Sequence, residues 1–163
     1  MYKIHTLAVL RNEIKMYNAL KKERDKIIED YEKPLEELKL KLLEVEEKLT
    51  LIKSPGKSDG LGGFVQDSAD KFNYLIDKKN DIEYDIRCYV QENEETYKKE
   101  LEAITARIVT VDAYLALLSE DDRKFIEDLY INDISFRTVM EKYKIQNEGN
   151  LYRKANNTLR FIL

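Results

Sequence analysis

The residues best suited to chemistry lie at the end of the chain, in 144–163, where amide and cationic side chains recur at helical spacing. This segment carries four basic side chains against one acidic, although the whole chain has a formal net charge of −4. If Leu151, Ala155, Leu159 and Ile162 face inward on a helix, the amide and cationic side chains face outward. Asparagine pairs with adenine and arginine with guanine in the major groove of DNA, while lysine neutralises phosphate.

This pattern predicts a recognition helix over residues 150–162 with a DNA-binding surface. Its candidate contact residues are Lys144, Asn147, Asn150, Arg153, Lys154, Asn157 and Arg160. A short helix, a tight turn at "KIQNEGN" and a basic final helix is the plan of a helix-turn-helix. The alternative is a solvated helix face that closes a small bundle and binds no nucleic acid. Periodicity alone leaves both interpretations open.

A second candidate is the tripeptide Gly56-Lys57-Ser58, which is similar to the end of a phosphate-binding P-loop. A P-loop also has a glycine five residues before the Gly-Lys pair and follows a buried strand. Here that earlier position is Leu51, and the preceding segment has the pattern of a helix. We therefore interpret "SPGKSDGLGGF", residues 54–64, as a turn in which glycines permit positive φ.

No group of side chains predicts an enzyme. A single histidine, His5, and a single cysteine, Cys88, exclude the usual His/Cys zinc sites and an intramolecular disulfide. The carboxylates nearly all fall at positions expected to face solvent, where a run of charge is usually a solvated face. We expect no catalytic residue, no metal and no cofactor.

A helical scaffold must position the basic segment. Charged residues make up 37% of the chain and apolar residues 43%, whereas glycine and proline are scarce, so loops should be few and short. The first arm carries a heptad seam at Leu35, Leu38, Leu42, Val45, Leu49 and Ile52. Pro34, at the start of this seam, either kinks the helix or begins a new one.

A second seam follows the glycines. It alternates steps of four and three at Tyr97, Leu101, Ile104, Ile108, Val111, Leu115 and Leu118. Two arms of similar length joined by a Gly-rich hinge at 53–66 predict a long antiparallel coiled-coil helical hairpin over residues 1–118. A narrow seam leaves each helix partly uncovered, so we expect a homo-oligomer, with a dimer favoured. The alternative is a monomer in which the N-terminal turns fold back as a third helix.

Residues 119–163 read as three short amphipathic helices. Ser119 and Ser135 are expected to cap the first two. The inward side chains of these two helices should be Phe125, Ile126, Leu129 and Tyr130, then Phe136, Val139, Met140 and Tyr143. The expected fold class is therefore all-α, a long antiparallel coiled-coil hairpin followed by a C-terminal three-helix helix-turn-helix unit.

These residues resemble a known family. The run "LSEDDRKFIEDLYINDISFRTVMEKYKI" and the helix after it are similar to the region-4 helix-turn-helix of sigma-70-type factors, in particular the ArpU/RinA-like regulators of Gram-positive phages and prophages. The matching features are 118–130, Ile134-Ser135-Phe136, Leu151, Thr158-Leu159 and Ile162. In that group a helical N-terminal part and a linker much like "SPGKSDGLGGF" precede the DNA-binding unit.

The resemblance implies a sequence-specific DNA-binding transcriptional regulator of phage or prophage genes, without catalytic activity. Its partners would be double-stranded DNA, a second copy of the chain and, as a further candidate, RNA polymerase. No apolar run is long enough to cross a bilayer, so we expect residence in the cytoplasm of the bacterial host. Two alternatives remain open: a small-terminase-like phage packaging protein that assembles as a ring, and a helical protein-interaction module that binds no DNA.

Overall fold

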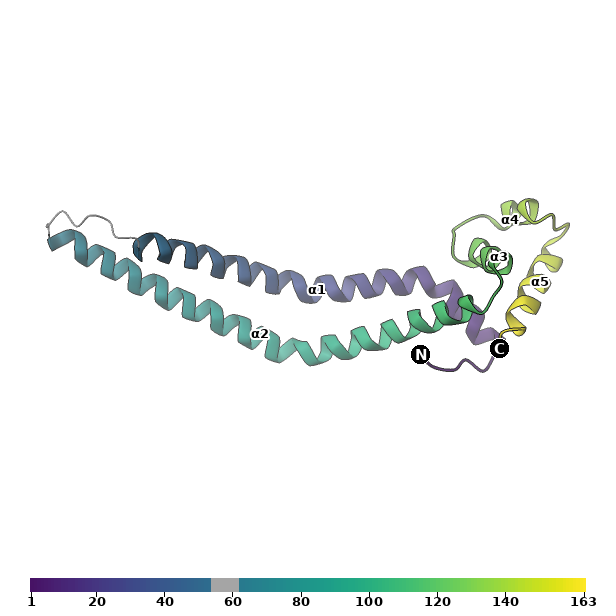
Figure 1. Cartoon of the computed structure of the whole chain (residues 1–163), viewed down its shortest axis with the longest axis horizontal. Coiled ribbons are helices and arrows are strands. Elements are labelled where there is room, and N and C mark those ends of the chain that lie inside the picture. Colours follow the sequence, from purple (N-terminus) through teal and green to yellow (C-terminus); the bar gives the residue numbers. More distant parts are fainter. Residues whose placement is uncertain (54–61) are drawn as a thin grey trace. The chain divides into compact units, whose positions relative to one another are not determined.

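The computed structural model describes the backbone of residues 1–53 and 62–163, and the side chains of 1–52 and 69–163. The helices of this part are α1 (Leu7–Lys53), α2 (Gly62–Ala116), α3 (Glu120–Tyr130), α4 (Phe136–Lys142) and α5 (Glu148–Arg160) (Figure 1). The described residues contain no strand, which confirms the all-α prediction. Gly56-Lys57-Ser58 and most of the predicted hinge at 53–66 lie outside the described residues, and α2 begins inside that hinge.

α1 runs without a break through Pro34, so this proline does not begin a new helix. Proline lacks the N–H that would bond to the carbonyl of Asp30, four residues earlier. The hydroxyl of Tyr89, on α2, supplies a donor at this place, 2.7 Å from the carbonyl oxygen of Tyr31 and 3.5 Å from that of Asp30. The second arm therefore supplies a hydroxyl donor beside the proline, with its shorter contact to Tyr31 and only a long contact to the carbonyl that the proline leaves without its helical partner.

Contacts divide the chain into two compact units. The arm unit is residues 27–99, in which the later part of α1 runs antiparallel to the earlier part of α2 (Figure 1). Its buried core consists of Val45, Leu49, Leu75 and Ile82, with Leu42, Ile52, Phe72, Ile76 and Ile86 packed around them. The later part of the predicted seam, Leu42, Val45, Leu49 and Ile52, thus packs against the second arm, which confirms a helical hairpin.

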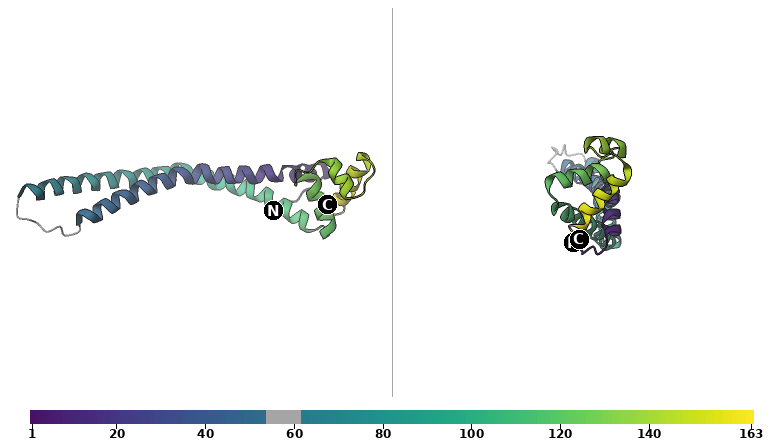
Figure 2. Two further views of the ribbon diagram at one scale, coloured as in Figure 1. Left: turned by 90° about the horizontal axis from the view of Figure 1, so that it is seen from above. Right: turned by 90° about the vertical axis from the view of Figure 1, so that its right-hand side faces the viewer.

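The terminal unit joins residues 1–26 to residues 100–163. Its core draws on α1, the end of α2 and all three short helices, and includes Leu10, Ile14, Val111, Leu115, Phe125, Ile126, Val139, Leu151, Ala155 and Leu159. Figure 2 shows the short helices grouped beside the start of α1 and the end of α2. The N-terminal turns belong to α1 and do not form the separate third helix of the monomer alternative.

One buried carboxylate ties α1 to α2 in the terminal unit. Glu13 is only 7% exposed. It accepts hydrogen bonds from Arg107 at 2.7 and 3.0 Å, and from the hydroxyl of Tyr2 at 3.0 Å. The hydrogen bonds from the Arg107 guanidinium lower the pKa of Glu13 in spite of its burial. The sequence predicted that nearly all carboxylates face solvent, and Glu13 is an exception. Its burial depends on a partner 94 residues away in the chain, which the local pattern does not indicate.

The first two short helices begin at the predicted caps. The Oγ of Ser119 accepts from the backbone N–H of Asp122 at 3.2 Å, and that of Ser135 from Thr138 at 3.3 Å. Phe136 corrects one prediction, because it is 38% exposed rather than inward. It is the first residue of a seven-residue helix, so Val139, one turn later, takes the buried position.

Candidate nucleic-acid interface

The candidate interface is built on α5, which begins at its own asparagine cap. The Oδ1 atom of Asn147 accepts from the backbone N–H of Asn150 at 2.8 Å, and the extended backbone of Asn147 stops the preceding turn. Leu151, Ala155 and Leu159 are fully buried, and Ile162 is half-buried. The predicted inward side of this helix is therefore confirmed. Burial at three consecutive turns fixes which face of α5 is left for solvent.

A strained residue sets the turn between α4 and α5. Lys144 has φ of 55°, the left-handed region in which a side chain costs about 1–2 kcal/mol. Its N–H donates to the carbonyl of Glu141 at 3.3 Å, while the next N–H, of Ile145, donates to Met140 at 2.9 Å. This pair of bonds is the Schellman arrangement that closes a helix, usually with glycine at the strained position. The side chain of Lys144 is exposed beside the start of α5.

Four of the predicted contact residues share the exposed face of α5. Their spacing of three, four and three residues places Asn150, Arg153, Asn157 and Arg160 on one side of a helix with 3.6 residues per turn. All four are exposed, and in the described part of the chain none of these side chains forms an ion pair or hydrogen bond. The only acidic residue on α5 is Glu148, in its first turn. We name these four residues the α5 face.

Two other predicted contacts already have structural roles. The oxygen of Asn147 is used in capping α5. The ammonium group of Lys154 lies 4.6 Å from the ring centroid of Phe125 and 5.5 Å from that of Tyr143, whose rings meet edge to face at 5.0 Å. Lys154 is exposed, but its charge lies over the aromatic rings of α3 and the end of α4. The structure thus places Lys154 at the flank of the α5 face.

Asp128 on α3 is a buried carboxylate that the sequence reasoning missed. It accepts from Lys142 Nζ at 2.6 Å, the Tyr143 hydroxyl at 2.7 Å and Asn132 Nδ2 at 2.8 Å. Burial acts to raise the pKa of Asp128, but these three hydrogen bonds outweigh it and the pKa lies below its usual value. Burial and the neighbouring carboxylate raise the pKa of Tyr143 to about 12. Asp128 therefore fastens the end of α4 to α3, just before the turn into α5.

A signal for Asp128 was present in the sequence. It lies two and three residues after Ile126 and Phe125, on the apolar side of a short amphipathic helix. A charged residue on such a side needs partners when the helix packs. Two of its three partners lie 14 and 15 residues further on, so the local pattern did not identify them.

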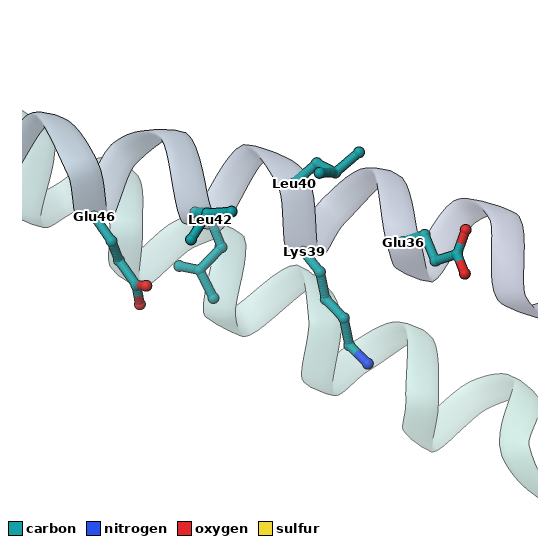
Figure 3. Close-up of a pocket in the computed structure, with 6 residues that line it drawn as sticks. Glu36, Lys39, Leu40, Leu42 and Glu46 are labelled. Atoms are coloured by element: carbon teal, nitrogen blue, oxygen red, sulfur yellow. The ribbon is translucent and has the colours of Figure 1, made fainter.

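The arm unit offers a different kind of surface. A shallow groove of about 400 Å³ on α1 is lined by Glu36, Lys39, Leu40, Leu42, Leu43 and Glu46. Figure 3 shows Leu42 directed toward α2 and Leu40 on the opposite side of α1. This groove contains no histidine, cysteine or hydroxyl nucleophile.

Across the residues that the structure describes, no group of three or more His, Cys, Asp or Glu side chains could hold a metal ion. None of the described helices combines the length and apolar character needed to cross a bilayer.

Comparison of the chain with protein-family models, curated proteins and solved structures finds no match. The class of protein defined by fold and site is thus an all-α protein with a helical hairpin and an exposed cationic helix face.

Proposed function

We propose that the protein binds double-stranded DNA through the α5 face and acts as a sequence-specific transcriptional regulator of phage or prophage genes in the bacterial cytoplasm. The observation that carries this proposal is the α5 face itself. It presents two guanidinium groups and two amides, exposed and without bonds among the described residues, on a helix anchored by three buried side chains. In this proposal α3, α4 and α5 form a helix-turn-helix, with α5 as the recognition helix.

The chemistry of the α5 face matches base edges. Arginine bonds to the O6 and N7 atoms of guanine, and asparagine to the N6 and N7 atoms of adenine, each good pair contributing about 1–3 kcal/mol of discrimination. Asn150 and Arg160 are ten residues apart, a rise of about 15 Å, which matches the axial length of about four base pairs. Lys144 lies in the turn before α5, where its ammonium group suits a phosphate.

The resemblance to sigma-70 region 4 is the basis for the phage and transcription parts of the proposal. It places α5 in the major groove and makes RNA polymerase a candidate partner. The Lys154 contact with Phe125 links α5 to α3, and Asp128 fastens the end of α4 to α3 just before the turn into α5. Both agree with this role, because base readout needs a rigidly positioned helix.

A second copy of the chain is the proposed partner of the arm unit. Leu40 and Leu43 are 60% and 50% exposed on α1, between Lys39 and Glu46 in the lining of the groove. An antiparallel second copy on this groove would bring each Lys39 toward the other copy's Glu46 while covering the leucines.

Sedimentation equilibrium should give twice the monomer mass, and Leu40→Glu with Leu43→Glu should return the monomer. A single monomer mass across micromolar concentrations rules out the dimer, and a larger closed assembly favours the packaging alternative.

DNA binding is tested by titrating a fluorescent mixed-sequence duplex at several salt concentrations. A dimer with about four phosphate contacts per subunit should give a slope on the order of −7 for the logarithm of the binding constant against that of salt. The matched variants are Arg153→Ala, expected to weaken binding, and Arg87→Ala, which removes the same charge from the arm unit. Absence of duplex binding at low salt would contradict the proposal and favour the protein-interaction alternative.

A further inference from the structure

The start of α1 carries a second set of cations in the terminal unit. Residues 1–26 hold seven basic and three acidic side chains. One of these acids, Glu13, is buried against Arg107, and Asp25 is paired with Arg24 at 3.0 Å. Four cationic side chains and one amide of α1 follow one another at steps of four, three, four and four residues, which places them on a single face of the helix. This group, which we name the α1 stripe, is Arg11, Lys15, Asn18, Lys22 and Lys26.

The α1 stripe begins beside α5. Arg11 Nη1 donates to Asn156 Oδ1 on α5 at 3.3 Å. Asn156 lies three residues after Arg153 and four before Arg160, so its helical neighbours are the two arginines of the α5 face. Both elements belong to the same compact unit. The positive charge of the α5 face therefore continues onto α1.

Two further contacts fix the middle of the stripe against the end of α3. Lys15 Nζ lies 5.4 Å from the ring centroid of Tyr130, and Asn18 Nδ2 donates to the carbonyl oxygen of Ile131 at 2.7 Å. These contacts hold one face of α1 in a defined orientation next to the short helices. The remaining members, Lys22 and Lys26, follow on the same face.

Lys22 and Lys26 have no structural partner that explains their presence. Both are exposed, and neither forms an ion pair or hydrogen bond with any residue that the structure describes. Like charges four residues apart on a helix repel one another. A polyanion would neutralise both charges, and the four-residue step corresponds to a rise of about 6 Å, which suits neighbouring phosphates of one strand.

We propose that Lys22 and Lys26, continuing from Lys15, bind backbone phosphates of the same duplex that the α5 face reads, and so lengthen the DNA interface onto α1. This inference rests on the proposed function. The contacts carry no base information, because phosphates are the same for every sequence. They raise the affinity for all duplexes alike and orient the protein on the DNA.

The test compares the unmodified protein with the double variant Lys22→Ala, Lys26→Ala on one mixed-sequence duplex. Each lost phosphate contact should make the salt slope shallower by about 1, so the double variant should differ by about 2. If the two proteins bind alike at 1 M salt, this difference weakens binding roughly a hundredfold at 0.1 M salt. The preference for a selected site over mixed sequence should stay unchanged.

The matched control is Lys41→Ala, Lys48→Ala, which removes two exposed lysines of α1 within the arm unit, outside the groove proposed for the second copy, and should leave the slope as in the unmodified protein. Circular dichroism melting checks that each variant is folded. The unmodified protein could bind duplex while the Lys22, Lys26 variant shows the same salt slope and affinity. That result would rule out phosphate binding by the α1 stripe and leave the proposed function standing. If the unmodified protein binds no duplex, both proposals are overturned.

Discussion

The Lys154 ammonium group lies 4.6 Å from the centroid of the Phe125 ring, so a side chain predicted to contact DNA also links α5 to α3. The sequence pattern predicts that replacing either Arg153 or Lys154 leaves stability nearly intact. The structure separates them. Lys154→Ala should lower the free energy of unfolding by about 0.5–1 kcal/mol through loss of the cation–π contact. Arg153→Ala should change it by less than about 0.5 kcal/mol. Urea denaturation of both variants checks this, and equal losses would contradict the assigned contact.

Asp128→Asn should destabilise the protein in a pH-dependent way. The folded-state pKa of Asp128 is lowered, so its stabilisation is fully present above the ordinary carboxyl pKa of about 4. That stabilisation is lost as the pH falls through the folded-state value. The variant should therefore lose about 1–2 kcal/mol at pH 7 and progressively less below pH 4. Denaturation at pH 7, 5 and 3 measures it, with exposed Asp121→Asn as the control. A difference that does not change with pH would rule out the charged contact.

Tyr89→Phe tests the hydrogen bonds from α2 to the backbone of α1 beside Pro34. The variant removes the hydroxyl that donates to the carbonyl of Tyr31 at 2.7 Å, and should lose about 1 kcal/mol of stability. It retains the ring, which packs 5.6 Å from that of Tyr31. In a Pro34→Ala background the restored backbone N–H should make the same change less costly. A double-mutant cycle by denaturation with no coupling between the two positions would refute this link.

Lys144→Gly should separate stability from DNA binding. Glycine adopts the left-handed conformation of this turn without a steric penalty, so the free energy of unfolding should rise by about 1 kcal/mol. The same change removes a proposed phosphate contact, so the salt slope should become shallower by about 1. Thermal melting and duplex titration give the two quantities. A more stable variant with unchanged DNA binding would remove Lys144 from the interface.

Local periodicity predicted much of the helical framework. The seam around Val45 and Leu49, the caps at Ser119 and Ser135, and the inward side of α5 at Leu151 all follow from spacing or from contacts within one turn. Such features depend on neighbours in the sequence and can be read from it.

Contacts across long sequence separations could not be read in the same way. Pairing of Glu13 with Arg107 unites the start of α1 with the end of α2, and Asp128 finds its partners on α4 and in the turn after it. The exposed position of Phe136 depends on how a two-turn helix docks on its neighbours. For the candidate site, the sequence pattern predicts the cationic face of the last helix. It does not predict that Lys154 lies over the ring of Phe125, because that contact joins residues of two different helices.

The most direct test of DNA binding by the α5 face is selection from a random-sequence duplex pool, with Arg153→Ala, Asn157→Ala alongside the unmodified protein. The unmodified protein should enrich one motif containing G·C and A·T pairs, and the variant should retain weak binding without enriching that motif. Enrichment of the same motif by both proteins, or retention of no duplex by either, would contradict recognition by α5.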